Sequence, residues 1–158
     1  MELKGIDRLN KFFTEWLHAH DFDIDAEMDN EFSIDLGRNV LHYAPYYDED
    51  NAKIFLEEVQ KDFPEIVECD DAILSFFHEI GHAETECEWE EEDWKEYDEF
   101  VKKCQDNREY FRHPIEWRAT EWGCEYILTH TAEVAELWQK MVELMTWFYT
   151  MNDVEDWE

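Results

Sequence analysis

Residues that interrupt structural elements or link domains are scarce in this sequence. Only four glycines and three prolines occur among its 158 residues, so no stretch has the composition of an interdomain linker. Hydrophobic residues make up 44% of the chain, which is enough for one packed core at a length typical of one domain. We therefore expect a single domain over residues 1–158.

Long hydrophobic runs and closely spaced cysteines are absent as well. The opening residues, MELKGIDRLNKFF, lack the apolar core of a signal peptide, and no run approaches membrane-spanning length. The four cysteines lie far apart in the sequence without a CxxC pair, which is typical of reduced thiols rather than of a disulfide framework. These absences favour a cytoplasmic protein that does not cross a membrane.

Positive charge is the scarcest property. Lysine and arginine together number 13 against 43 aspartates and glutamates, which gives a formal net charge of −30. Nucleic acids and anionic lipids are bound through positive groups that neutralise phosphates, so we expect neither as a direct partner. The segment 84–99 is acidic at ten of its sixteen positions. Blocks of like charge are usually solvated, so we expect this segment to form an excursion on the surface.

What the sequence has in plenty is aromatic residues and apolar residues at regular spacing. Aromatic residues make up 16% of the chain and argue against disorder despite the charge. Helical spacing predicts helices over residues 6–19, 51–62, 70–84, 114–130 and 134–148. Alternation of apolar and polar residues predicts three short strands over residues 22–28, 31–36 and 40–44. The expected fold is α+β, in which a small antiparallel sheet is combined with a helical C-terminal part.

The segment SFFHEIGHAE, residues 75–84, carries two histidines four positions apart. On a helix such side chains lie one above the other, so His78 and His82 can converge on one Zn²⁺. Glu79 is rotated by about 100° from His78, which puts it beside such a metal rather than on it. There it could take a proton from zinc-bound water as a general base. The motif HExxH therefore predicts metal-assisted hydrolysis.

A structural histidine pair is the alternative interpretation, because a chain rich in glutamate produces some HExxH matches by chance. The surroundings of the motif favour metal binding. Four apolar residues would bury its helix in the core: Ile73, Leu74, Phe76 and Phe77. Gly81 costs about 1 kcal/mol in a helix interior, which is reasonable where another backbone or a substrate comes close.

A third protein ligand is needed, because a catalytic zinc normally has three such ligands and one open position. The segment HPIEWRATEWGCEYIL offers three glutamates: Glu116, Glu121 and Glu125. Small residues share the helix face of the first of them: Ala119, Thr120 and Gly123. That face can pack tightly against the histidine helix, so Glu116 is the preferred ligand. His113 is held in reserve, and Glu121 and Glu125 are explained more simply as solvated residues.

These features together resemble the ImmA/IrrE-type metallopeptidases, compact gluzincins common in bacteria, mobile elements and phages. The resemblance covers about residues 20–130 and depends on HEIGH and on the ExxAxxW pattern within EWRATEW. It implies a zincin-like fold, Zn²⁺ held by His78, His82 and Glu116, and Glu79 as general base. The substrate would be a protein or peptide, and the source a phage or mobile element. The acidic insertion between His82 and Glu116 and the large negative charge depart from that family.

A second class of function follows from the charge. An acidic surface can imitate the regular negative charge of duplex DNA and so occupy a nucleic-acid-binding protein, such as a host defence enzyme. The protein would then be a non-enzymatic inhibitor with a basic partner. The acidic segment does not decide between the two, since it would also attract a basic substrate. We expect a zinc-dependent metallopeptidase, with the DNA mimic as the alternative.

Overall fold

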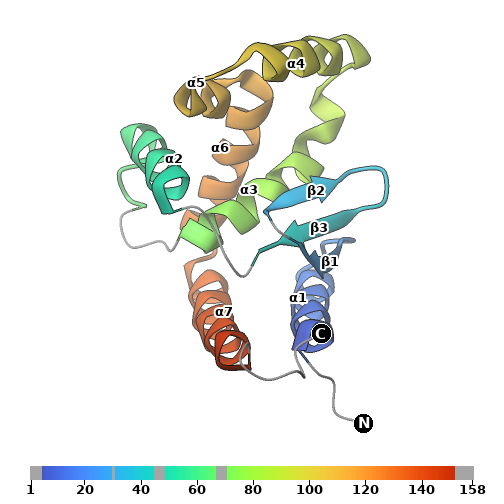
Figure 1. Cartoon of the computed structure of the whole chain (residues 1–158), viewed down its shortest axis with the longest axis vertical. Coiled ribbons are helices and arrows are strands. Elements are labelled where there is room, and N and C mark those ends of the chain that lie inside the picture. The colour runs from blue at the N-terminus through green and yellow to red at the C-terminus, as the bar shows by residue number, and fades with distance from the viewer. Residues whose placement is uncertain (1–4, 30, 45–48, 67–70, 152–158) are drawn as a thin grey trace. The chain divides into compact units, whose positions relative to one another are not determined.

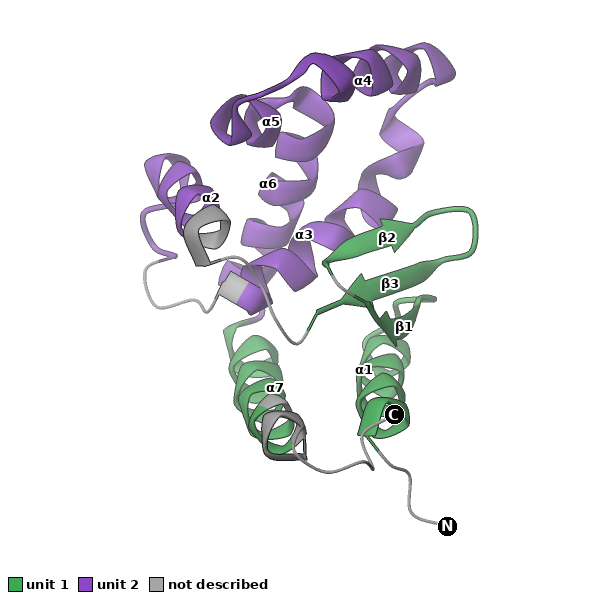
Figure 2. Ribbon diagram, in the orientation of Figure 1, with its two compact units in different colours: residues 1–46, 131–158 green, residues 47–130 purple. Residues whose placement is uncertain are grey.

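The structure is a computed structural model that describes residues 5–29, 31–44, 49–66 and 71–151 (Figure 1). Its fold is α+β, as predicted, with most residues in helices and a small sheet. The chain divides into two compact units, one formed by residues 1–46 and 131–158 and the other by residues 47–130 (Figure 2).

The first unit is built on two helices, α1 (Gly5–Ala19) and α7 (Thr131–Met151). Leu9, Phe13 and Leu17 recur every four residues along α1 and are fully buried, which confirms the predicted helix face. Polar side chains of α1 also bind the first strand of the sheet: Thr14 accepts a hydrogen bond from the amide of Ala26, and Asn10 accepts one from Met28. Among the described residues, none of the helices is long and apolar enough to cross a membrane.

The sheet of this unit is mixed, so the prediction of an antiparallel meander is wrong. Its strands are β1 (Asp25–Met28), β2 (Ser33–Asp35) and β3 (Val40–Tyr43). Their order is β1-β3-β2, with β1 parallel and β2 antiparallel to β3. The physical reason lies in burial: β3 is buried at three of its four positions, whereas β1 and β2 carry acidic residues. The apolar strand takes the centre and the acidic strands take the edges.

The second unit is helical wherever it has regular structure in the described residues. Its elements are α2 (Glu49–Asp62), α3 (Asp71–Thr85), the short 3₁₀ turn η1 (Glu86–Glu88), α4 (Glu91–Lys103), α5 (Asn107–Arg112) and α6 (Pro114–Thr129). Helices α3 and α6 pack most closely. A Cβ atom on Gly81 would lie 2.2 Å from the carbonyl oxygen of Ala119, and one on Gly123 would lie 3.0 Å from the backbone of Phe77. The close backbone approach predicted at Gly81 is therefore confirmed, and Gly123 provides a second one.

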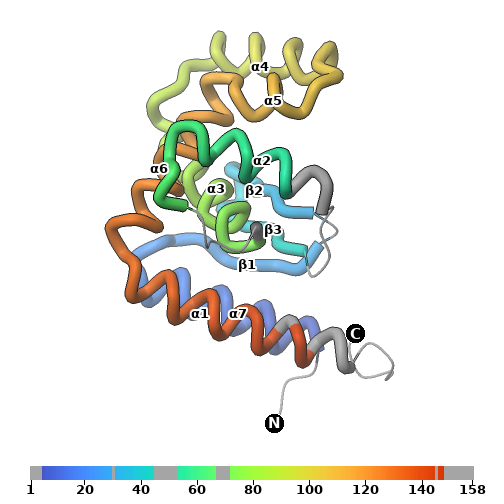
Figure 3. The backbone as a smooth tube through the Cα atoms, turned by 90° about the vertical axis from the view of Figure 1, so that its left-hand side faces the viewer, coloured from blue at the N-terminus to red at the C-terminus, as the bar shows by residue number. Residues whose placement is uncertain are grey.

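The acidic segment 84–99 is helical over most of its length. Its carboxylates crowd the first turn of α4, where they complement the positive end of the helix dipole, and Lys102 and Lys103 occupy the last turn. The amide of Glu90 donates to the carboxylate of Asp93 at 2.8 Å, which caps this start. No residue of α4 is fully buried. Figure 3 shows α4 and α5 next to each other within the second unit.

Candidate metal centre

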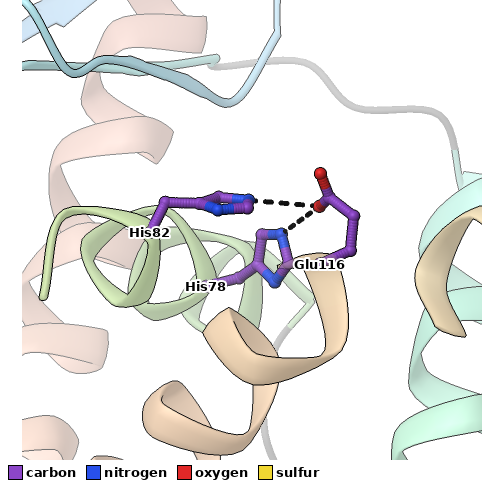
Figure 4. Close-up of side chains that lie close together, drawn as sticks. All are labelled: His78, His82 and Glu116. Carbon is purple, nitrogen blue, oxygen red and sulfur yellow. Dashed lines mark hydrogen bonds and ion pairs between the residues drawn. The ribbon is translucent and has the colours of Figure 1, made fainter. Parts of the chain in front are cut away.

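Three side chains predicted from the sequence as ligands lie together in the second unit. His78 and His82 project from α3, and Glu116 projects from the first turn of α6 (Figure 4). The Nε2 atoms of the two histidines lie 2.9 and 3.1 Å from the same carboxylate oxygen, Oε1 of Glu116. The exposed fractions of His78, His82 and Glu116 are only 7%, 9% and 3%. Two imidazoles and a carboxylate thus converge at a site that has little exposure to bulk water.

The local sequence explains this convergence. Helix α3 is anchored by fully buried Phe76, Phe77 and Ile80, which direct the face with the histidine pair towards α6. Pro114 begins α6, as its fixed backbone angle favours at a first helical position. The buried face of α6 contains Glu116 and the small residues that follow it at helical spacing: Ala119, Thr120 and Gly123. The predicted packing of this face against α3 is confirmed.

The donor atoms of the three side chains fit a zinc ion in kind and in spacing. Zinc binds imidazole nitrogens and carboxylate oxygens at about 2.0–2.1 Å, so its tetrahedral ligand atoms lie about 3.3 Å apart. Here one donor atom from each of His78, His82 and Glu116 lies within 4.8 Å of the others. The measured nitrogen–oxygen distances of 2.9 and 3.1 Å are within a few tenths of an ångström of the tetrahedral value. The three donor atoms are therefore close enough together to share one ion.

Thr120 contacts both His78 and the backbone of Glu116. Its hydroxyl donates to the carbonyl oxygen of Glu116 at 3.1 Å and lies 2.8 Å from Nδ1 of His78. The hydroxyl has a single hydrogen, so while it is donated to the carbonyl oxygen, the hydroxyl oxygen accepts a hydrogen bond from Nδ1–H. A neutral His78 then has its lone pair on Nε2, facing the carboxylate oxygen at 2.9 Å. Two lone pairs at this distance repel, so a proton or a metal cation is required between them.

The electrostatics of the cluster show the same need for positive charge. Burial alone would raise the pKa of Glu116, but the hydrogen bonds and charges of His78 and His82 hold it far below its usual range. Burial lowers the pKa of His82, but the hydrogen bond and charge of Glu116, together with the charge of Glu79, outweigh burial and raise it. The carboxylate is therefore ionised and attracts a cation to the two histidines.

Glu79 lies beside the cluster rather than in it. It is half-buried on α3, and its charge raises the pKa of both His82 and Tyr110. It does not belong to the group of donor atoms that converge within 4.8 Å. This position is the one that the helical rotation from His78 predicts, and its role as a base stays a prediction.

The other candidate ligands lie elsewhere in the second unit. His113 caps α6, since its Nδ1 accepts a hydrogen bond from the amide of Ile115, and its ring packs 4.8 Å from that of Phe100. Glu121 is half-buried and Glu125 is exposed, and the charges of both act on Arg118. Among the described residues, the convergent group contains none of His113, Glu121 and Glu125.

Two tyrosines that were not predicted from the sequence complete the surroundings of Glu116. The hydroxyl of Tyr97, on α4, donates to Oε2 of Glu116, and that of Tyr110, on α5, lies 3.2 Å from the same oxygen. Burial and the negative charge of Glu116 raise the pKa of both tyrosines, so their hydroxyls stay protonated as donors. The one available signal was the helical spacing of Trp94, Tyr97 and Val101, which places Tyr97 on the apolar face of a helix, and Tyr110 had none.

No family model, no curated protein and no solved structure matches this chain. The resemblance to ImmA/IrrE-type metallopeptidases thus depends on the HEIGH and EWRATEW segments alone. The function has to be argued from the geometry of the cluster and the chemistry of its donor atoms.

Proposed function

We propose that this protein is a zinc-dependent metallopeptidase-like hydrolase with a zincin-like active site. In this proposal His78, His82 and Glu116 hold Zn²⁺, and Glu79 is the general base. The observation that carries the proposal is the convergence of two histidine nitrogens on one buried carboxylate oxygen, at 2.9 and 3.1 Å.

A metal ion accounts for this arrangement better than a set of protons does. Without a metal, the His78 tautomer that donates from Nδ1 to Thr120 requires a second proton on that ring. A protonated imidazole loses hydration on burial, and burial does lower the pKa of His82 before Glu116 compensates. One divalent cation would satisfy the lone pairs of both rings and the carboxylate together.

The residues around the cluster suit hydrolysis of a peptide bond. When bound, Zn²⁺ polarises a carbonyl group and lowers the pKa of water from 15.7 to about 7. Glu79 accepts a proton from the attacking water as its oxygen bonds to the carbonyl carbon. Glu79 then delivers this proton to the nitrogen as the carbon–nitrogen bond breaks, which releases an amine and a carboxylic acid. The substrate is a protein or a peptide.

Replacement of Glu79 tests this chemistry. Glu79→Gln should keep the bound metal and the fold but lose hydrolysis by about 100-fold or more, because an amide cannot accept the proton. Hydrolysis is measured on a peptide library by mass spectrometry, with metal content determined on the same samples. Glu84→Gln is the matched control, since Glu84 lies on the same helix with an exposed side chain and should behave as wild type. Loss of the metal in Glu79→Gln, or unchanged cleavage, would contradict the assigned role.

The alternative proposal, a DNA mimic, is supported by the exposed carboxylates of α4: Glu91, Glu92, Glu96, Asp98 and Glu99. Such a protein should displace a sequence-independent DNA-binding protein from labelled duplex DNA, and less so as salt rises. Replacing Glu91, Glu92, Glu96 and Glu99 with glutamine should weaken this displacement and leave metal content unchanged. Anisotropy of the labelled DNA is the measurement. Displacement that changes neither with salt nor with the substitutions would exclude α4 as the surface that imitates DNA.

A further inference from the structure

The carboxylate of Glu116 is bound on both of its oxygens, and by different kinds of group. Oε1 faces the two histidine nitrogens at 2.9 and 3.1 Å. Oε2 accepts from the hydroxyls of Tyr97 and Tyr110, which themselves lie 3.2 Å apart. The two sides of one carboxylate are thus divided between a cation-binding cluster and a pair of phenols.

We propose that Tyr97 and Tyr110 are positioning residues that restrict Glu116 to binding the metal through Oε1 alone. The inference rests on the proposed metal centre. A carboxylate can bind a cation through one or both oxygens, and a second metal–oxygen bond would need the lone pairs of Oε2. Two phenol hydrogen bonds occupy those lone pairs. Three protein atoms then hold the metal, and its fourth position stays available for water or substrate.

Tyr110 is held in place by ion pairs on both sides of it along α5. Arg108 binds Glu57 and Glu58 of α2, each at 3.0 Å. Arg112 binds Glu58 at 3.0 Å, and its guanidinium also lies 3.9 Å from the ring centroid of Trp117. These contacts attach α5 to α2 and α6. The helix that bears Tyr110 is therefore held in place, with the Tyr110 hydroxyl next to Glu116.

Tyr97 lies on a different helix, α4, and aromatic packing fixes the position of its ring. Its ring lies edge-on to those of Trp94 and His113, with centroids 5.9 and 5.0 Å away. His113 is the N-cap of α6, three residues before Glu116. The acidic segment therefore contributes a helix that reaches the cluster through one uncharged residue, while the carboxylates in its first turn stay at the surface.

Removing the hydroxyls without the rings tests the inference. Zinc affinity is measured by competition with a chelator for wild type, Tyr97→Phe, Tyr110→Phe and the double variant. Partners of metal ligands typically contribute 10–100-fold to affinity, so the double variant should bind zinc about 10–100-fold more weakly. Each single variant should lose less, because one remaining hydroxyl still occupies Oε2, and the double loss should exceed the product of the single losses. Tyr126→Phe on α6 is the matched control and should bind zinc as wild type does.

The absorption spectrum of the cobalt-substituted protein provides a readout beyond affinity. Four-coordinate Co²⁺ absorbs more strongly than five-coordinate Co²⁺, so the double variant, in which Oε2 can also bind, should show weaker bands than wild type. Zinc affinity and cobalt spectrum both unchanged in the double variant would overturn the positioning role while leaving the metal centre intact. Absence of zinc and cobalt binding in wild type would instead overturn the proposed function, and the inference with it.

Discussion

Among the described residues, the second unit contains two buried glutamates with opposite surroundings. Glu58 and Glu116 are 4% and 3% exposed, and the pKa of each is held below its usual range. Glu58 is bound by side chains with permanent positive charge: Lys61 at 2.8 Å and Arg108 and Arg112 at 3.0 Å. Glu116 is bound by two histidines, which can be neutral at physiological pH.

The difference separates a structural ion cluster from a candidate metal centre. The carboxylate of Glu58 is neutralised within the protein, and its partners tie α2 to α5. The carboxylate of Glu116 is neutralised only when the histidines take up protons or a cation lies between them. Among the residues that the structure describes, Glu116 forms ion pairs only with His78 and His82, whereas three lysine or arginine side chains pair with Glu58.

The largest effect is expected when the charge of Glu58 is removed. Glu58→Gln should lower the free energy of unfolding by about 2 kcal/mol, whether or not zinc is present. The loss should be below the 3–5 kcal/mol typical of a fully buried pair, because Arg108 and Arg112 are 44% and 33% exposed. Urea denaturation gives the measurement. Glu57→Gln is the control, with an exposed carboxylate and an expected change of about 0.5 kcal/mol or less. An effect that appears only with zinc would contradict the separation of the two clusters.

A smaller effect is expected when pH is varied in the presence of a chelator. Lys61, Arg108 and Arg112 lower the pKa of Glu58 from 4.5 to about 2 against the opposing effect of burial. This stabilisation is therefore complete above pH 4.5 and is lost as pH falls towards 2. The pKa of His82 is raised above 6.5 despite burial, chiefly by its hydrogen bond to Glu116. Its contribution is complete below pH 6.5 and is lost as pH rises through the raised value.

The midpoint of thermal unfolding, followed by circular dichroism from pH 3 to 9, separates these two losses. Glu58→Gln should reduce the loss at acidic pH and keep the loss at alkaline pH. Added zinc should remove the alkaline loss alone, because the ion takes the place of the proton between Glu116 and His82. An alkaline loss that zinc leaves unchanged would show that His82 titrates independently of a metal.

The sequence predicts those parts of the cluster that depend on local periodicity. The spacing of His78 and His82 orients both rings to one face of α3, and the small residues after Glu116 mark the face of α6 that packs there. Gly81 has a local signal too, because glycine in a helix interior needs a reason. For these positions, helical spacing is enough to predict which side chains share a face of the helix.

Other contacts that depend on how separate helices and strands pack could not be predicted in this way. The arginines that bind Glu58 lie 50 and 54 residues after it, and Tyr97 and Tyr110 reach Glu116 from two separate helices. The strand order β1-β3-β2 could not be predicted either, because three- and four-residue strands contain no pattern that selects their neighbours. Burial of β3 decides the pairing, and burial is a property of the folded chain.

The metal content of the purified protein tests the central claim most directly. Wild type and Glu58→Gln should each contain about one zinc per chain by atomic emission, and His78→Ala should contain almost none. Chelation should lower the midpoint of thermal unfolding of wild type but leave that of His78→Ala unchanged, because zinc binding is linked to folding. A wild-type protein that contains no zinc, takes up none when it is added and keeps its full stability on chelation would contradict the account.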